Sequence, residues 1–118
     1  MIVDDEKLIC EWLEFCISAN PACTLVGVAH NGREGLELYC REKPELVLTD
    51  IKMPVMDGLK AAQQIRRSGS RVPIIAVTAY AYDRDRQKAL EAGCDEYLAK
   101  PLTGDTLRQT LHRLLAGE

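Results

Sequence analysis

The fold of this 118-residue chain is decided by the segment Leu46-Val47-Leu48-Thr49-Asp50-Ile51-Lys52-Met53-Pro54-Val55-Met56-Asp57-Gly58. Its first residues are aliphatic on both faces, which is typical of a parallel strand covered by helices on both sides. Asp50 follows that strand directly, and Asp57-Gly58 has the form of a helix start with the aspartate as N-cap. An ionised carboxylate is costly to bury, so an aspartate at the end of an apolar strand needs a physical explanation.

Short apolar runs and longer amphipathic runs alternate along the whole sequence. The apolar runs predict strands over residues 2–3, 24–29, 46–49, 73–77 and 96–99. The amphipathic runs predict helices over residues 6–20, 31–43, 57–67, 82–92 and 104–115. In the first of these helices, Leu8, Trp12 and Phe15 recur at helical spacing. Stop signals follow three of the helices, at Pro21, Pro44 and Gly93.

This strict alternation predicts an α/β fold with a parallel sheet. Five βα units in 118 residues match a flavodoxin-like, doubly wound (βα)5 domain that spans residues 1–118. Its five parallel strands would have the order 2-1-3-4-5, with helices on both faces. In that order the ligand crevice lies beyond the carboxyl ends of strands one and three, where the winding reverses. Asp50 would therefore face a crevice rather than a dry core.

Composition and charge exclude several classes of protein. A net charge of -3 and a pI near 5.4 give no reason to expect direct nucleic-acid or membrane-surface binding. No apolar run approaches the ~20 residues of a membrane span, and we expect neither a membrane segment nor a signal peptide. The cysteines lack metal-ligand spacing, so we expect small buried hydrophobic residues in a reducing, cytoplasmic protein. They are Cys10, Cys16, Cys23, Cys40 and Cys94.

Polar side chains follow the other strands at the same edge of the predicted sheet. Asp4 and Asp5 follow the first strand, Thr78 ends the fourth, and Lys100 follows the fifth. Together with Asp50 these side chains give three carboxylates, one hydroxyl and one ammonium at one rim. Carboxylates packed this closely repel each other unless a cation compensates their charge.

A hard divalent cation such as Mg2+ would relieve that repulsion, because it prefers oxygen ligands. Asp5 and Asp50 could bind it directly and Asp4 through a water molecule. The main-chain carbonyl of Lys52 could supply a further ligand.

With its charge compensated, the rim could carry out phosphoryl chemistry. A carboxylate oxygen of Asp50 could attack a phosphoryl group in line, with Lys100 stabilising the equatorial oxygens. The Thr78 hydroxyl could then donate a hydrogen bond to the new phosphate. Each residue alone has a simpler interpretation, since Asp4 or Asp5 could cap the first helix and Lys100 could be a solvated surface charge. The simpler interpretations require five coincidences on one edge of the sheet. We therefore favour a functional site.

The chain resembles the receiver domain of bacterial two-component response regulators over nearly its whole length. Residues 3–6 resemble the acidic pair of that family, and Asp50 with residues 53–58 matches its phosphoacceptor segment. Thr78-Ala79 matches the switch hydroxyl. Tyr97 and Lys100-Pro101 match the switch aromatic residue and the lysine.

The resemblance implies a phosphorelay module and not an enzyme, apart from its own phosphorylation and dephosphorylation. Asp50 would take a phosphoryl group from a histidine of a sensor kinase or a histidine phosphotransfer domain, with Mg2+ as cofactor. Thr78 would then move toward the phosphate and Tyr97 would swing inward. A downstream protein would bind the face formed by residues 82–92, 96–99 and 104–115. The cognate kinase, the stimulus, the output and the oligomeric state stay open.

Several details of the family pattern bear on this chain. The family implies a cis Lys100-Pro101 bond, and the first strand is shorter here than usual. Lys52 and Tyr80 would flank the phosphate, and because both are long or bulky we expect slow self-dephosphorylation. No output domain follows residue 115, so we expect a free-standing receiver or one cut from a larger protein. Residues 53–58, 78–81 and 93–97 resemble receivers of hybrid sensor kinases.

Two alternatives compete with this interpretation. A pseudo-receiver would bind partners without phosphorylation, but such proteins usually lack an acidic residue or the lysine. A Mg2+-dependent phosphatase similar to the haloacid dehalogenases would need a DxD motif, whereas Asp4 and Asp5 are adjacent and no cap domain fits in the chain. His30 and His112 have no nucleophile nearby in the predicted fold, and we interpret both as structural or solvent-exposed.

Overall fold

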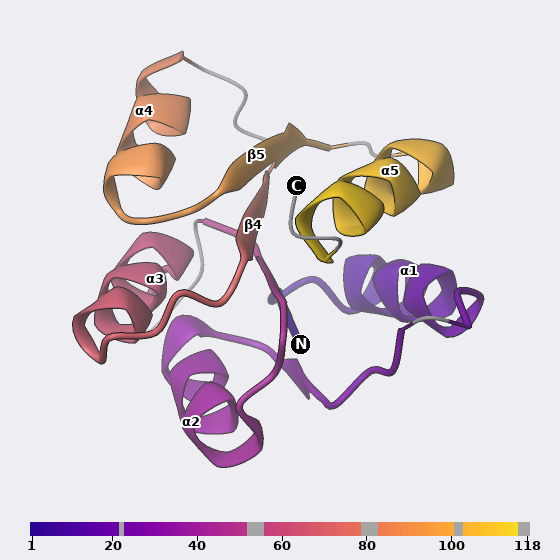
Figure 1. Ribbon diagram of the computed structural model, residues 1–118, viewed down its shortest axis with the longest axis horizontal. Helices are drawn as coiled ribbons and strands as arrows, with labels where there is room; N and C mark the ends of the chain where they lie inside the picture. The colour runs from indigo at the N-terminus through magenta and orange to yellow at the C-terminus, as the bar shows by residue number, and fades with distance from the viewer. Residues whose placement is uncertain (22, 52–55, 79–82, 101–102, 116–118) are drawn as a thin grey trace.

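A computed structural model describes residues 1–21, 23–51, 56–78, 83–100 and 103–115. Strands and helices alternate through the described residues, as the sequence predicts (Figure 1). The strands are β1 (Ile2–Val3), β2 (Val28–Ala29), β3 (Val47–Thr49), β4 (Ile74–Thr78) and β5 (Glu96–Ala99). The helices are α1 (Lys7–Ser18), α2 (Gly32–Glu42), α3 (Gly58–Arg67), α4 (Asp83–Glu91) and α5 (Gly104–Leu115).

The five strands form one parallel sheet in the order β2-β1-β3-β4-β5, which confirms the predicted topology. In Figure 1, α1 and α5 cover one face of the sheet and α2, α3 and α4 the other. In this order the winding of the chain reverses between β1 and β3, which are neighbours in the sheet, so the residues that follow these two strands meet at one edge. The register pairs Val3 with Thr49, which places the residues that follow each strand side by side.

Each face of the sheet has its own apolar cluster. Ile2, Leu48, Ile75 and Val77 point toward α1 and α5 and pack with buried residues of those helices, such as Leu13. On the other face, side chains from β1, β3 and β4 pack with Leu38, Ala62, Ile65 and Ala89 of α2, α3 and α4. Strands covered on both faces need apolar residues at every position, which explains the continuous aliphatic runs.

The helix boundaries follow the expected local chemistry. The Asn31 side chain accepts a hydrogen bond from the Glu34 amide at 2.9 Å, and the Asp57 side chain accepts one from the Lys60 amide at 2.9 Å. Both predicted N-caps are therefore confirmed. Gly93 follows α4 with a φ of 107°, a left-handed conformation in which glycine has no steric cost.

Two predictions about the first third of the chain are wrong. The predicted strand over residues 24–29 is only Val28–Ala29. The reason is register: Ile2 pairs with Val28, so Thr24 to Val26 extend past the first residue of the short β1 and have no strand to pair with. Helix α1 ends at Ser18, three residues before the proline that was expected to stop it.

A third difference concerns which side of α1 is buried. Leu8 and Phe15 are 78% and 72% exposed, and Trp12 is also exposed. The buried residues of α1 are Cys10, Leu13 and Ile17. Apolar residues surround much of this helix, so their spacing predicts a helix but cannot decide which face meets the sheet.

The described cysteines are all free. Cys10 and Cys94 are buried as predicted, whereas Cys16 and Cys23 are half-buried and Cys40 is exposed, so the prediction of buried cysteines is wrong for these three. Burial raises the pKa of both Cys10 and Cys94 to about 11, so these thiols stay protonated at neutral pH. Among the helices that the structure describes, none combines the length and the apolar composition required to span a bilayer.

Candidate metal centre at the carboxyl edge of the sheet

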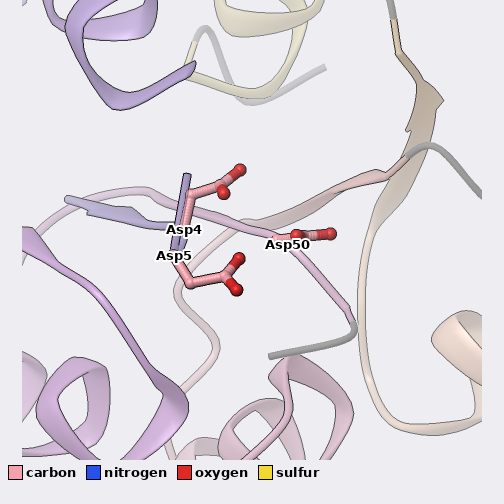
Figure 2. A group of neighbouring side chains, drawn as sticks. All are labelled: Asp4, Asp5 and Asp50. Carbon is pink, nitrogen blue, oxygen red and sulfur yellow. The ribbon is translucent and has the colours of Figure 1, made fainter. Parts of the chain in front are cut away.

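Three aspartates meet at the carboxyl ends of β1 and β3 (Figure 2). The Asp50 amide donates to the Val3 carbonyl at 2.8 Å, which fixes the ends of β3 and β1 next to each other, and the Asp4 amide donates to the Ala29 carbonyl of β2 at 3.0 Å. One carboxylate oxygen from each of Asp4, Asp5 and Asp50 lies within 4.8 Å of the other two. Three oxygen donors at this spacing, on rigid strand ends, fit a hard divalent cation such as Mg2+.

The three carboxylates differ in how accessible they are. Asp4 is 1% exposed, and its Oδ1 accepts a hydrogen bond from the Glu6 amide at 2.9 Å. Its main-chain carbonyl lies 3.2 Å from the Cys10 Sγ and 3.3 Å from the His30 Nδ1. Asp5 is exposed instead. The buried Asp4 is thus engaged within the protein, whereas Asp5 is open to an incoming ion.

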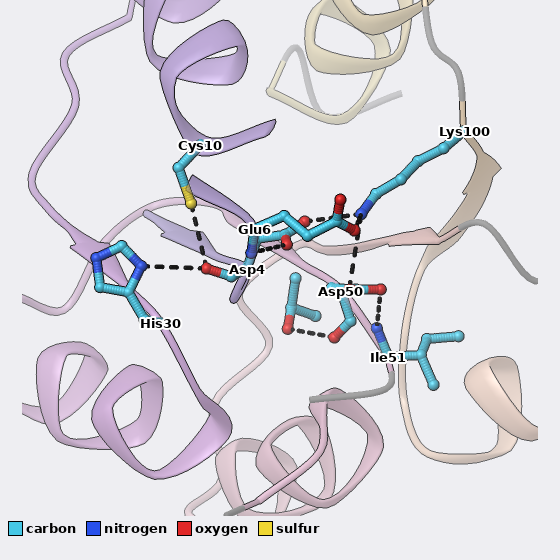
Figure 3. Close-up of polar contacts among 8 residues, drawn as sticks. Asp4, Glu6, Cys10, His30, Asp50, Ile51 and Lys100 are labelled. Atoms are coloured by element: carbon cyan, nitrogen blue, oxygen red, sulfur yellow. Dashed lines mark hydrogen bonds and ion pairs between the residues drawn. The ribbon is translucent and has the colours of Figure 1, made fainter. Parts of the chain in front are cut away.

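Lys100 brings a positive charge into this cluster from the end of β5 (Figure 3). Its Nζ lies 2.9 Å from the Asp4 Oδ2, 3.6 Å from the Asp50 Oδ2 and 3.4 Å from the Glu6 Oε1. Its main-chain amide donates to the Thr78 carbonyl at 2.7 Å, so β4 fixes where the side chain begins. The ammonium therefore compensates part of the acidic charge.

Burial and charge shift the pKa values of this group. Asp50 is 6% exposed, and desolvation raises its pKa to about 6. Lys100 and the amide of Ile51, which donates to the Asp50 Oδ1 at 2.8 Å, oppose this rise, while Asp4 adds to it.

Burial alone would lower the pKa of Lys100. The hydrogen bond to Asp4 and the charges of Asp50, Asp4 and Glu6 outweigh it, so the pKa of Lys100 is raised. The lysine is thus firmly charged, and Asp50 is destabilised in its charged form.

Comparison with known proteins gives a consistent result. The family model of the response regulator receiver domain matches residues 1–112. The response regulator MprA of Mycolicibacterium vanbaalenii is 36% identical over 115 residues, which cover 98% of this chain and 49% of that protein. The structure of a LuxR-family two-component response regulator from Aurantimonas sp. SI85-9A1 has a TM-score of 0.93 and 29% identity, covering 100% of this chain and 84% of that one. A CheY-like receiver domain protein from Methanospirillum hungatei JF-1 has a TM-score of 0.90 and 28% identity, covering 98% of this chain and 91% of that one.

The chain belongs to the response regulator receiver family. This receiver domain spans about half the length of the MprA relatives that it matches.

Two further residues of the predicted site lie behind the receiver's acidic cluster. Thr78 is the last residue of β4 and is fully buried, opposite Ala99 of β5. Tyr97 is also buried, within the apolar cluster that includes Ala89, so in this structure its ring already points inward. Within the described part of the chain, its hydroxyl has no hydrogen-bond partner. Burial raises the pKa of this phenol.

Gly58 holds the end of β3 against α3. A Cβ at this position would lie 1.9 Å from the Asp50 carbonyl oxygen and 2.9 Å from the Thr49 hydroxyl. The Gly58 amide donates to the Ile51 carbonyl at 2.7 Å, which ties the start of α3 to the residue after Asp50. The glycine after Asp57 is thus needed for a close approach of backbone to backbone, a role that the sequence alone did not reveal.

The contact between Glu6 and Lys100 was not predicted from the sequence. Glu6 directly follows the acidic pair. The helical pattern of α1 indicated only that it begins that helix. His30 was expected to be structural or exposed, and it is exposed beside the Asp4 carbonyl. Four other predictions fall outside the described residues: the Lys52 carbonyl as a metal ligand, Ala79 in the switch segment, the shielding role of Tyr80, and the cis bond to Pro101.

Proposed function

We propose that this receiver domain accepts a phosphoryl group on Asp50 from a phosphohistidine of a sensor kinase or histidine phosphotransfer domain. The observation that carries the proposal is a buried Asp50 carboxylate held beside two more aspartates and a lysine. Burial raises the pKa of the Asp50 carboxyl group, so its charged form is costly to hold. A buried carboxylate beside two further carboxylates and an ammonium suits an acidic phosphoacceptor.

The transfer is a single displacement at phosphorus. A carboxylate oxygen of Asp50 forms the new O–P bond while the P–N bond to the donor histidine breaks, and the imidazole keeps the electron pair. Lys100, whose Nζ lies 3.6 Å from the Asp50 Oδ2, would bind a phosphoryl oxygen, and this short distance supports that role. Hydrolysis later returns the carboxylate and releases inorganic phosphate.

Asp4, Asp5 and Asp50 would hold the magnesium ion, Asp5 and Asp50 directly and Asp4 through water. When bound, the ion supplies positive charge that stabilises the oxygens of the transferred group. The remaining task of the chain is positioning. The pairing of β1 with β3 brings the carboxylates together. The hydrogen bond from the Lys100 amide to the Thr78 carbonyl fixes the backbone from which the ammonium reaches them.

Phosphorylation would act as a switch that changes partner binding. The buried Thr78 lies at the end of β4, where a hydroxyl could approach a phosphate on Asp50. Movement there would bias the position of Tyr97 and the face formed by α4, β5 and α5, which we propose binds the downstream protein. In this proposal the domain is a cytoplasmic signalling module that catalyses only its own phosphoryl transfer and hydrolysis.

Intact-mass measurement tests the phosphoacceptor directly. The protein is incubated with Mg2+ and acetyl phosphate, beside the variants Asp50→Asn and Asp57→Asn. We expect one phosphoryl group on the wild-type protein and on Asp57→Asn, because asparagine retains the cap of α3. We expect none on Asp50→Asn.

Other outcomes would support the alternatives. A stable absence of any adduct, with acetyl phosphate and with phosphorylated kinase, would support a pseudo-receiver. Continuous turnover of added phosphoesters would support a phosphatase. An adduct that survives Asp50→Asn would contradict the assignment of the phosphoacceptor.

A further inference from the structure

Lys100 contacts the same carboxylates that could hold a metal ion. Its Nζ lies 2.9 Å from the Asp4 Oδ2 and 3.6 Å from the Asp50 Oδ2, two of the three carboxylates that could share an ion, and its side chain is only 11% exposed. A divalent cation and an ammonium on the same carboxylates repel each other. Binding of Mg2+ would therefore favour withdrawal of the ammonium from these aspartates.

Glu6 lies where the displaced ammonium could go. Its Oε1 is 3.4 Å from the Lys100 Nζ, and its side chain is 60% exposed (Figure 3). Glu6 is not among the carboxylates close enough together to share the ion. Although it is the N-cap residue of α1, its side chain makes no capping hydrogen bond, so the carboxylate is not committed to the helix.

The local backbone holds Glu6 in this place. Its amide donates to the Asp4 Oδ1 at 2.9 Å, while the Asp4 Oδ2 accepts from Lys100 at 2.9 Å. The turn from Asp4 to Glu6 thus presents two carboxylates to one ammonium, one buried and one exposed. A short movement of the Lys100 side chain away from Asp4 and Asp50 would keep its contact with Glu6.

We propose that Glu6 is a positioning residue that holds the Lys100 ammonium when Mg2+ occupies the aspartates. This inference rests on the proposed function, because it assumes that the aspartates bind Mg2+. Glu6 would offset part of the cost of displacing Lys100 and would keep the ammonium at the rim, ready for the phosphoryl group. It would act through Lys100 and not by touching the ion.

A double-mutant cycle on Mg2+ affinity tests this role, with affinity measured by calorimetry on the full chain. We expect Glu6→Gln to weaken Mg2+ binding about threefold, the size typical of a partly exposed ion pair. In a Lys100→Gln background Glu6 has lost its ion-pair partner. There Glu6→Gln should reduce the logarithm of the Mg2+ affinity by less than about half as much. Glu11→Gln, the same charge change further along α1, is the control and should leave affinity within about 1.5-fold.

A crystal structure of the wild-type protein with Mg2+ gives a second readout that does not depend on the stability of any variant. We expect Lys100 to keep its ion pair with Glu6 and to have lost its contact with Asp4 or Asp50. An equal effect of Glu6→Gln in both backgrounds, or a Lys100 that leaves Glu6 when the ion binds, would overturn the role of Glu6 alone. Failure of the wild-type protein to bind Mg2+ would overturn the proposed function as well.

Discussion

Ile75 in the middle of β4 and Asp50 at the end of β3 are both shielded from water, but with opposite consequences. The apolar side chain of Ile75 gains free energy from burial among the residues of α1 and α5. The carboxylate of Asp50 loses hydration, and its pKa rises to about 6. The interior of the sheet is thus built for stability, whereas its carboxyl edge retains charge at a cost to stability. Such a cost is expected where a site must bind ions.

The largest predicted effect is in the apolar interior of the sheet. Ile75→Ala should lower the free energy of unfolding by about 2–5 kcal/mol, because it removes buried methyl groups and leaves a cavity between β4 and the helices. Urea denaturation followed by circular dichroism measures this change. A loss below about 1 kcal/mol would show that this interior is less tightly packed than the structure indicates.

The contact between the apolar interior and the carboxyl edge of the sheet can be disrupted at Gly58. Gly58→Ala should cost about 2 kcal/mol, because the new Cβ would meet the Asp50 carbonyl oxygen at 1.9 Å and the backbone must shift. Gly104→Ala is the matched control, since Gly104 also begins a helix but a Cβ there meets nothing within 4 Å. That control should be neutral or slightly stabilising. The same denaturation curves compare the two variants, and equal effects would contradict the close approach.

At the charged carboxyl edge of the sheet we predict a gain in stability from a substitution. Without Mg2+, Asp50→Asn should raise the free energy of unfolding at pH 7 by about 2 kcal/mol, because the raised pKa means that ionisation opposes folding. The pKa is about 6 in the folded protein and 3.8 ordinarily. Ionisation in the unfolded chain therefore begins near pH 4, and the wild-type protein loses stability as the pH rises from about 4 to 6.

Denaturation at pH 3.5 and at pH 7 measures this dependence. The advantage of Asp50→Asn should be nearly absent at the lower pH, where Asp50 is protonated in the folded protein and mostly protonated in the unfolded chain. A variant that is less stable than the wild-type protein at pH 7 would show that the carboxylate of Asp50 stabilises the fold.

The smallest predicted effect is at the half-buried N-cap of α3. Asp57→Ala should cost about 1 kcal/mol, because it removes the side-chain acceptor for the Lys60 amide. It should leave phosphorylation of Asp50 intact, which separates the capping aspartate from the phosphoacceptor only seven positions away. Loss of phosphorylation in this variant, with an otherwise normal fold, would mean that Asp57 has a chemical role.

The sequence was sufficient to predict the fold and most of the rim. Continuous aliphatic runs at β3 and β4 indicate strands covered on both faces, and five alternating βα units in a chain of this length match the doubly wound order 2-1-3-4-5. Because parallel strands end at one edge, the order of residues along the chain is enough to group Asp4, Asp5, Asp50, Thr78 and Lys100. Asn31 and Asp57 are caps by their residue type and position.

What the sequence could not supply depends on distances in three dimensions. The exposed face of α1 carries Leu8 and Phe15, whose hydrophobicity alone predicts burial. The length of β2 is limited by the short β1 that it pairs with, a tertiary constraint. The close approach behind Gly58 and the contact of Glu6 with Lys100 join residues by geometry and not by any local pattern.

The pKa of the Asp50 carboxyl group, measured by 13C NMR with and without Mg2+, tests the central claim most directly. Without the ion we predict a value of about 6, because the buried carboxylate lies beside Asp4 and Asp5. With saturating Mg2+ we predict a value below the ordinary 3.8, because a bound cation favours the charged form. A pKa near 3.8 that does not respond to Mg2+ would contradict both the cost of the empty site and its proposed use.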